Sequence, residues 1–206
     1  MRIRRRFRKD DGVALVEMAL VAPLLALLIA GIVEFGTLWR DNLTVATSTR
    51  AAARVVSNLG DERLADYEAL LTLDAALGGV DGLAVEGVLI YNAASADGEP
   101  HVSCFDASGD PQASSLGECN FYTAAQVASM ASLSCAVTCA EFPVSPTCAG
   151  GLTVYFCPQD DRETDQSLGN TSVGIWVRTS RPYFTGMFPG SGVTMTDQTV
   201  MRVEPR

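Results

Sequence analysis

The feature that most constrains this chain is an apolar run from Val13 to Val33, which follows directly on a cluster of basic residues. The run reads VALVEMALVAPLLALLIAGIV and holds one ionisable side chain, Glu17, and one helix breaker, Pro23. A helix needs about 20 apolar residues to cross the hydrocarbon core of a bilayer. The run therefore predicts a transmembrane helix.

The charges on either side of the run predict its orientation. Six basic residues precede it, and only Arg40 follows it closely. Positive charge is retained on the cytoplasmic side, so we expect the N-terminus inside and residues beyond about 40 outside the cytoplasmic membrane. A secretory signal peptide is the alternative, but its apolar region normally spans about 7–15 residues and ends in a small-residue cleavage site. Because the run is longer and no such site follows it, a permanent anchor is favoured.

The composition excludes two classes of protein. With 48% hydrophobic and 19% charged residues, the chain is too apolar to be disordered. A net charge of −9 argues against nucleic-acid binding, which needs a basic face. The acidic excess falls beyond residue 40, in the part of the chain that is expected outside the membrane.

All six cysteines also lie beyond the apolar run. An even number of cysteines in an exported region predicts disulfides, here three, whose pairing the sequence does not determine. A metal or redox site at the C-x-x-x-C pair is the alternative, but the spacing and the single histidine disfavour it. The candidate disulfide cysteines are Cys104, Cys119, Cys135, Cys139, Cys148 and Cys157.

Glu17 is unusual because a carboxylate inside an apolar helix is costly and is usually kept for a partner or a function. The simpler alternative is that its side chain snorkels to the cytoplasmic headgroups. The basic segment 2–9, then Gly12, then an apolar run with an acid at its fifth position resemble the layout of a type IV prepilin. This resemblance implies that a prepilin peptidase cuts between Gly12 and Val13, which leaves an α-amine on Val13 that can neutralise Glu17.

The segment from Gly12 to Trp39 resembles the N-terminal signature of the TadE-like family of tight-adherence (Flp-type) pilus assembly proteins. The matching elements are Gly12, Val16-Glu17, Ala19-Leu20-Val21, Pro23, Gly31-Ile32 and Glu34-Phe35-Gly36. The resemblance implies a minor pilin or pseudopilin of the bacterial inner membrane. Its implied partners are the prepilin peptidase, sister pseudopilins, the major Flp pilin and the inner-membrane assembly platform.

Residues 37–59 keep helical spacing beyond the apolar run. We expect the membrane helix to continue outward to Gly60 as one long helix whose apolar stripe packs on the outer domain. The stripe is formed by Leu38, Val45, Ala52, Val56 and Leu59. Pro23 is expected to kink the helix, because it removes a backbone hydrogen bond. Glu34, near the outer headgroups, needs no special role.

The outer part predicts an α+β fold in which the long helix packs on a small antiparallel sheet that carries a disulfide-rich loop insert. A second helix is expected over 61–77, capped by Asp61, and a further one over 121–133. Short or alternating apolar patterns predict strands at 84–91, 152–157, 172–180 and 193–203, the last with a bulge near Thr199. The expected organisation is a leader at 1–12, a membrane helix at 13–36, a helical stalk at 37–60 and an extracytoplasmic domain at 61–206.

The loop 181–192 concentrates Tyr183, Phe184, Met187 and Phe188. Such a cluster marks either a contact with a partner or membrane, or a hairpin end that plugs into the core, and the second interpretation is favoured.

Catalytic patterns are missing from the sequence. His101 is the single histidine, so no Ser-His-Asp triad can be built without it, and the acidic segment 160–165 lacks the ligand spacing of a calcium loop. We therefore expect neither an enzyme nor a cofactor. A structural component of a pilus is favoured, and the alternative is an uncleaved, membrane-tethered extracytoplasmic binding protein.

Overall fold

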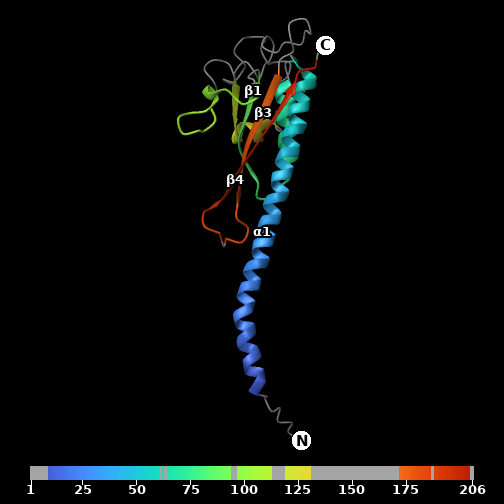
Figure 1. The fold of residues 1–206 in the computed structure, drawn as a ribbon. Helices are drawn as coiled ribbons and strands as arrows, with labels where there is room; N and C mark the ends of the chain where they lie inside the picture. The colour runs from blue at the N-terminus through green and yellow to red at the C-terminus, as the bar shows by residue number, and fades with distance from the viewer. Residues whose placement is uncertain are drawn as a thin grey trace.

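One helix, α1 (Lys9–Leu59), runs the full length of the described part of the molecule and continues far below the sheet (Figure 1). The structure is a computed structural model. It describes residues 9–60, 62, 65–93, 97–112, 119–130, 172–186 and 188–204. At 1.5 Å per residue, a helix of 51 residues is roughly 75 Å long.

The lower half of α1 contains the whole apolar run and passes through Pro23 without a break. It is the one helix, among the residues described, that is long and apolar enough to cross a membrane. The most apolar 18-residue stretch of this helix has no buried residue, so the described domain does not cover it. An apolar surface of this size is stable only in lipid or against other proteins.

The upper half of α1 packs on the domain through the expected stripe. Val45, Ala52 and Val56 are buried, and Leu38 and Leu59 are half-buried at the two ends. Gly60 then adopts a left-handed φ of 56°, which glycine reaches without a Cβ clash, and the helix ends there as predicted.

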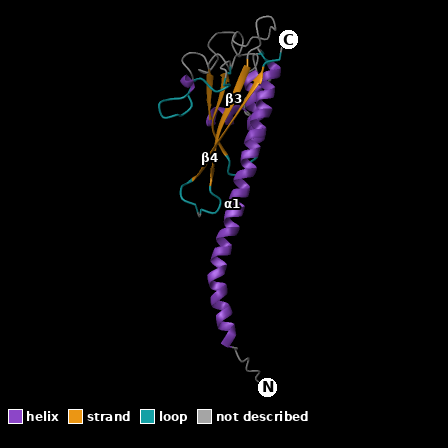
Figure 2. Cartoon of the chain, in the orientation of Figure 1, coloured by secondary structure: helices purple, strands orange, loops and turns teal. Residues whose placement is uncertain are grey.

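Two further helices and a four-stranded antiparallel sheet complete the described fold (Figure 2). The elements are α2 (Ala65–Leu77), β1 (Ala84–Asn92), a 3-10 turn η1 (Val102–Cys104), β2 (Cys119–Thr123), α3 (Ala124–Met130), β3 (Ser172–Pro182) and β4 (Gly192–Arg202). The strand order is β2-β1-β3-β4, so β3 pairs with both β1 and β4.

One face of the sheet packs on the helices. Val88 and Ile90 of β1 and Ile175 of β3 pack there against Leu70 and Leu73 of α2, and all five side chains are fully buried. Alternate residues of a strand point to opposite faces, so this layer uses every second position of β1 and β3.

The other face carries a smaller core around Tyr91 and Trp176. The Tyr91 ring lies over Gly174, where an added Cβ would come within 2.1 Å of the ring. The Tyr91 hydroxyl donates a 2.8 Å hydrogen bond to the Gly98 carbonyl oxygen. Burial raises the pKa of the Tyr91 phenol above its ordinary value, and the Glu99 carboxylate acts in the same direction.

The predicted α+β architecture is confirmed, but three local expectations are wrong. Residues 121–123 belong to β2, and α3 begins only at Ala124. The register of β3 with β4 is continuous through Thr199, and the irregularity falls instead on β1, between Val85 and Gly87. The second helix begins at Ala65 rather than directly after the predicted cap. The strand predicted at 152–157 and the cap Asp61 lie outside the described residues.

Candidate functional site: the apolar helix and the hairpin that packs on it

Glu17 lies on the bare lower half of α1, with its side chain exposed. No hydrogen bond or ion pair joins it to another residue in the described part of the chain. Glu17 is 17 residues before Glu34, which places the two carboxylates roughly 25 Å apart along the helix. In a bilayer, a carboxylate on this surface needs a partner from elsewhere, since the domain is out of its reach.

The other residues of the predicted processing site also lie on this open part of α1. Gly12 is helical, and a Cβ added to it would meet nothing within 4 Å. Val13 is exposed about one helical turn below Glu17, and Pro23 is exposed within the helix. The open space means that packing does not require glycine at position 12. A helical backbone does not require it either, because glycine lowers helix stability by about 1 kcal/mol relative to alanine.

The expectation that Glu34 has no special role is wrong. Its side chain is only 2% exposed and accepts three hydrogen bonds from the loop between β3 and β4. The Phe184 amide donates to Oε1, and the amide and hydroxyl of Thr185 donate to Oε2, each at 2.9 Å. Hydrogen bonds to a charged acceptor are stronger than neutral ones, so Glu34 holds the loop against α1.

Two further contacts align the same hairpin with α1. Asp41, about two helical turns beyond the apolar run and 2% exposed, pairs with the Arg181 guanidinium at the end of β3. At the far end of the hairpin, Ser57 bonds the Arg202 carbonyl oxygen, and the Glu204 amide donates to the Ser57 carbonyl oxygen at 2.9 Å. These contacts place the hairpin along α1 from the C-terminal end of the helix down to Glu34. Figure 1 shows β4 and the loop below it beside this helix.

The loop at the lower end of the hairpin, which we call the hairpin tip, comprises the described residues 183–186 and 188–191. The Phe184 side chain is 73% exposed and that of Phe188 is 41% exposed. The Tyr183 and Phe188 rings lie 5.6 Å apart. The expectation that these aromatics plug into the core is therefore wrong for both phenylalanines.

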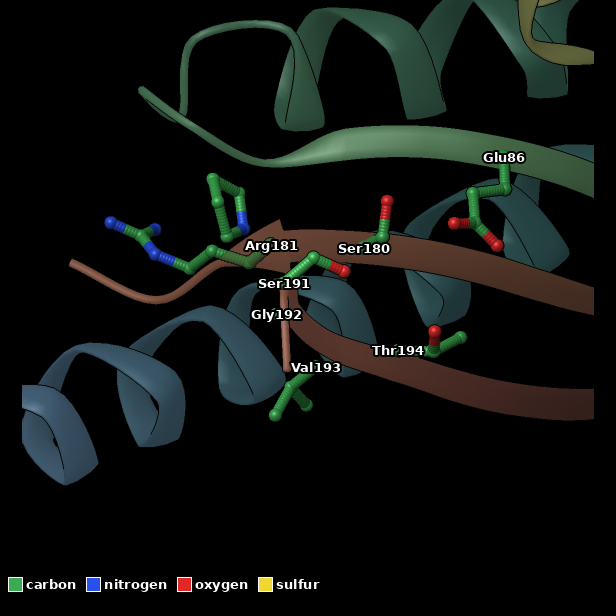
Figure 3. Close-up of a pocket in the computed structure, with 8 residues that line it drawn as sticks. Glu86, Ser180, Arg181, Ser191, Gly192, Val193 and Thr194 are labelled. Atoms are coloured by element: carbon green, nitrogen blue, oxygen red, sulfur yellow. The ribbon is translucent and has the colours of Figure 1, made fainter. Parts of the chain in front are cut away.

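Two shallow cavities lie beside the hairpin. The larger, about 300 Å³, lies at the base of the tip and is lined by Glu86, Ser180 and Thr194, among others (Figure 3). In that view the Arg181 guanidinium, which pairs with Asp41, extends away from the other labelled side chains. The lining offers hydroxyls and one carboxylate but no imidazole or thiol, so it presents no paired nucleophile and base of the usual kind.

The smaller cavity, about 150 Å³, lies between α1 and the turn after α2. It is lined by Arg40, Asp41, Asp81 and Arg181, so positive and negative side chains are balanced there. Such a lining does not select an ion of either sign.

One disulfide is present among the candidate cysteines that the structure describes. It joins Cys104 to Cys119, a pairing that the sequence left open, and connects η1 to the start of β2. The other four candidates, Cys135, Cys139, Cys148 and Cys157, lie outside the described residues, as does the acidic segment 160–165. His101 caps the 3-10 turn through its Nδ1, which accepts from the Ser103 amide. No cluster of three metal-binding side chains occurs in the described ranges.

Sequence reasoning missed Glu34, Asp41 and Arg181 as structural anchors. A signal for two of them was available, because Glu34 and Asp41 are seven residues apart and therefore share one face of α1. That face also carries Leu38 and Val45 of the packing stripe, so both carboxylates point at the domain. Nothing in the local pattern identifies their partners, which lie about 140 to 150 residues further along the chain.

Residues 12–54 match the profile of the family described as TadE-like protein, which agrees with the resemblance found from the sequence. The match covers the apolar half of α1 and most of the half that packs on the domain, and it includes Gly12, Glu17, Glu34 and Asp41. No curated protein and no solved structure was found that matches the chain.

Proposed function

We propose, from the TadE-like match over residues 12–54, that this protein is a minor pilin or pseudopilin that helps to assemble a bacterial tight-adherence pilus. Its role is structural rather than catalytic. A prepilin peptidase removes the leader after Gly12, and the mature helix associates laterally with the helices of neighbouring subunits. The acidic domain is carried at the base or the tip of the fibre.

The observation that carries the proposal is the exposed Glu17 on a helix surface that the domain leaves uncovered. Cleavage after Gly12 creates a positive α-amine on Val13, about one helical turn from this carboxylate. Both charges avoid lipid, so each is stabilised by pairing with the other, within one subunit or between neighbours. Pairing between neighbours would set the axial step of the assembled helices.

Gly12 supports the processing step. It lies inside a regular helix with open space around it, so its own fold does not require glycine there. A peptidase that must bring its catalytic groups close to the peptide backbone does benefit from a residue without a side chain. The glycine is thus better explained by recognition than by folding.

The charge pattern supports an orientation with the N-terminus in the cytoplasm and the domain outside. The Cys104–Cys119 disulfide agrees with an oxidising compartment for the domain. In this arrangement the peptidase and the inner-membrane assembly platform act on the membrane helix. Sister pseudopilins and the major Flp pilin pack beside it.

The test is a Glu17→Gln variant in cells that build the pilus. The variant leaves the α-ammonium without its partner. Because a loss of about 1.4 kcal/mol in pairing free energy changes the assembly equilibrium tenfold, we expect pilus output to fall by about tenfold or more. Glu86→Gln, which changes an exposed carboxylate of the domain, is the matched control and should leave output unchanged. Equal pilus output from Glu17→Gln and wild type, at equal protein levels in the membrane, would refute the pairing.

A further inference from the structure

The hairpin tip presents apolar side chains where a folded domain normally hides them. Outside α1, the large hydrophobic side chains that are exposed in the described chain are Val102, Phe184, Phe188 and Val200. Two of these four belong to the hairpin tip, and they are aromatic. A cluster of exposed rings on one loop indicates a contact surface rather than the scattered apolar exposure of an ordinary surface.

The hydrogen bonds to Glu34 determine the height of this loop along α1. The apolar run ends at Val33, and 21 residues at 1.5 Å per residue span about 31 Å, the thickness of a hydrocarbon core. The Phe184 and Thr185 amides lie 2.9 Å from the carboxylate of the next residue, Glu34. The hairpin tip is therefore at the outer boundary of the membrane if the run spans it.

The direction of the loop agrees with this height. Figure 1 shows the hairpin tip below the sheet, beside α1 and on the side of the N-terminal half of this helix. Because Arg181 meets Asp41 and Thr185 meets Glu34, the chain descends along α1 as it leaves β3. The tip is thus the part of the described domain that comes nearest to the bare apolar helix.

The composition of the loop suits an environment between water and lipid. Residues 182–192 read PYFTGMFPGSG and contain no charged side chain, in a chain with a net charge of −9. Burying an ionised group is what makes insertion into a bilayer costly, and that cost does not arise here. Aromatic side chains are also the ones that membrane proteins concentrate at the interface.

We propose that the hairpin tip inserts Phe184 and Phe188 into the outer boundary between lipid headgroups and acyl chains, as a second membrane contact beside the helix. The occupant of this surface is lipid, and no specific headgroup is required. Glu34 is then covered by the loop instead of facing lipid, which explains why a carboxylate is tolerated directly after the span. Together the two contacts hold the domain at a set distance from the bilayer.

This inference rests on the membrane span of the proposed function, but not on cleavage or on pilus assembly. The experiment uses the full chain with Trp39→Phe, reconstituted in phosphatidylcholine vesicles with or without bromine in the upper part of the acyl chains. The emission of the remaining Trp176, which is buried in the domain, is recorded on this background alone and subtracted from that of each variant. Phe184→Trp is the test variant, and Phe188→Trp repeats the test at the second ring. Because both native side chains are exposed and Glu34 is bound by the backbone, the new ring should not disturb the fold.

Two controls distinguish the possible failures. Val102→Trp introduces tryptophan at a similarly exposed apolar position near the opposite end of the sheet, and Leu24→Trp introduces it near the middle of the span. We expect brominated lipid to reduce the emission from position 184 by about twofold, since interfacial apolar groups lie about 5–10 Å deep at this boundary. Leu24→Trp should also lose emission, and Val102→Trp should not.

The contrary results are equally specific. If Leu24→Trp is quenched but neither hairpin variant is, the span is inserted and the lipid contact of the tip is refuted. If Leu24→Trp is not quenched either, the membrane span fails and the contact fails with it. Emission from position 184 that follows the protein-to-lipid ratio and ignores bromine would assign the tip to a second copy of the chain and overturn the proposal.

Discussion

Replacing Glu34 by alanine should release the hairpin tip from α1 without unfolding the domain. The substitution leaves three donors without their acceptor, namely the Phe184 amide and the amide and hydroxyl of Thr185. A donor that loses its partner in a buried place typically weakens the closed state by a factor of ten or more, and water can reach part of this loop. We therefore expect the open state of the tip to become about 100-fold more populated, which is two such factors rather than three.

Hydrogen exchange read by mass spectrometry, with the protein in lipid nanodiscs, measures this opening directly. In Glu34→Ala the peptide that contains Phe184 and Thr185 should exchange about 100-fold faster, because exchange reports the population of the open state. Glu34→Gln keeps one oxygen acceptor and should show an intermediate increase of about tenfold.

The matched control is Glu17→Gln, the same chemical change on the same helix but far from the hairpin. It should leave exchange of the hairpin peptide unchanged, since Glu17 makes no contact with any part of the hairpin that is described. If Glu34→Ala leaves the protection of Phe184 and Thr185 at the wild-type level, these hydrogen bonds do not hold the tip, and the account of Glu34 is wrong.

Three other substitutions test the remaining anchors of the domain. Arg181→Met leaves the buried Asp41 carboxylate without its ion pair and should lower the free energy of unfolding by about 3 kcal/mol in urea titrations of the domain signal. Replacing Cys104 and Cys119 by serine removes a bridge with a sequence separation of 15, so thermal melting should show a loss of about 3 kcal/mol. Gly174→Ala forces a Cβ into the tyrosine ring opposite it on β1 and should cost about 2 kcal/mol by denaturant midpoint. A change within about 0.5 kcal/mol, as is usual for surface positions, would contradict the contact concerned in each case.

The elements with a regular apolar pattern were predictable from sequence. The long helix beyond the span follows from the seven-residue spacing of Leu38, Val45 and Ala52, and β1 and β3 follow from their β-branched residues. Such patterns identify a helix or strand because each repeats a local geometry of the backbone. The α+β architecture follows from the order of these segments.

The short strand β2 was missed because its pattern is not local. Cys119–Thr123 is five residues long and pairs at the edge of the sheet with β1. Its first residue is held by the disulfide, its Phe121 ring lies over Gly87 of β1, and its Tyr122 is fully buried in the core on the helix side of the sheet. Cross-strand contacts of this kind decide edge strands, and a single segment does not reveal them.

The candidate site was predictable only where its chemistry is exceptional. Glu17 stands out because a carboxylate within an apolar run has a high cost, whereas Glu34 at the end of that run resembles an ordinary interfacial residue. Two of the three donors to Glu34 are backbone amides, which carry no sequence signature. The exposure of Phe184 could not be predicted from the sequence for a related reason. A loop that packs into the core and a loop that faces a membrane have the same composition.

Assembly as a pilin requires above all that the exposed carboxylate of Glu17 be matched by a new chain terminus at Val13. The direct measurement is the intact mass of the protein purified from cells that build the pilus, compared with cells that lack the prepilin peptidase. A Gly12→Val variant is the matched control, because the space around Gly12 lets the side chain fit while recognition is lost. We expect the wild-type protein to lack residues 1–12, and we expect the variant, and the protein from peptidase-deficient cells, to retain them. A wild-type protein that still begins at Met1 would contradict the account and favour an uncleaved, membrane-tethered binding protein.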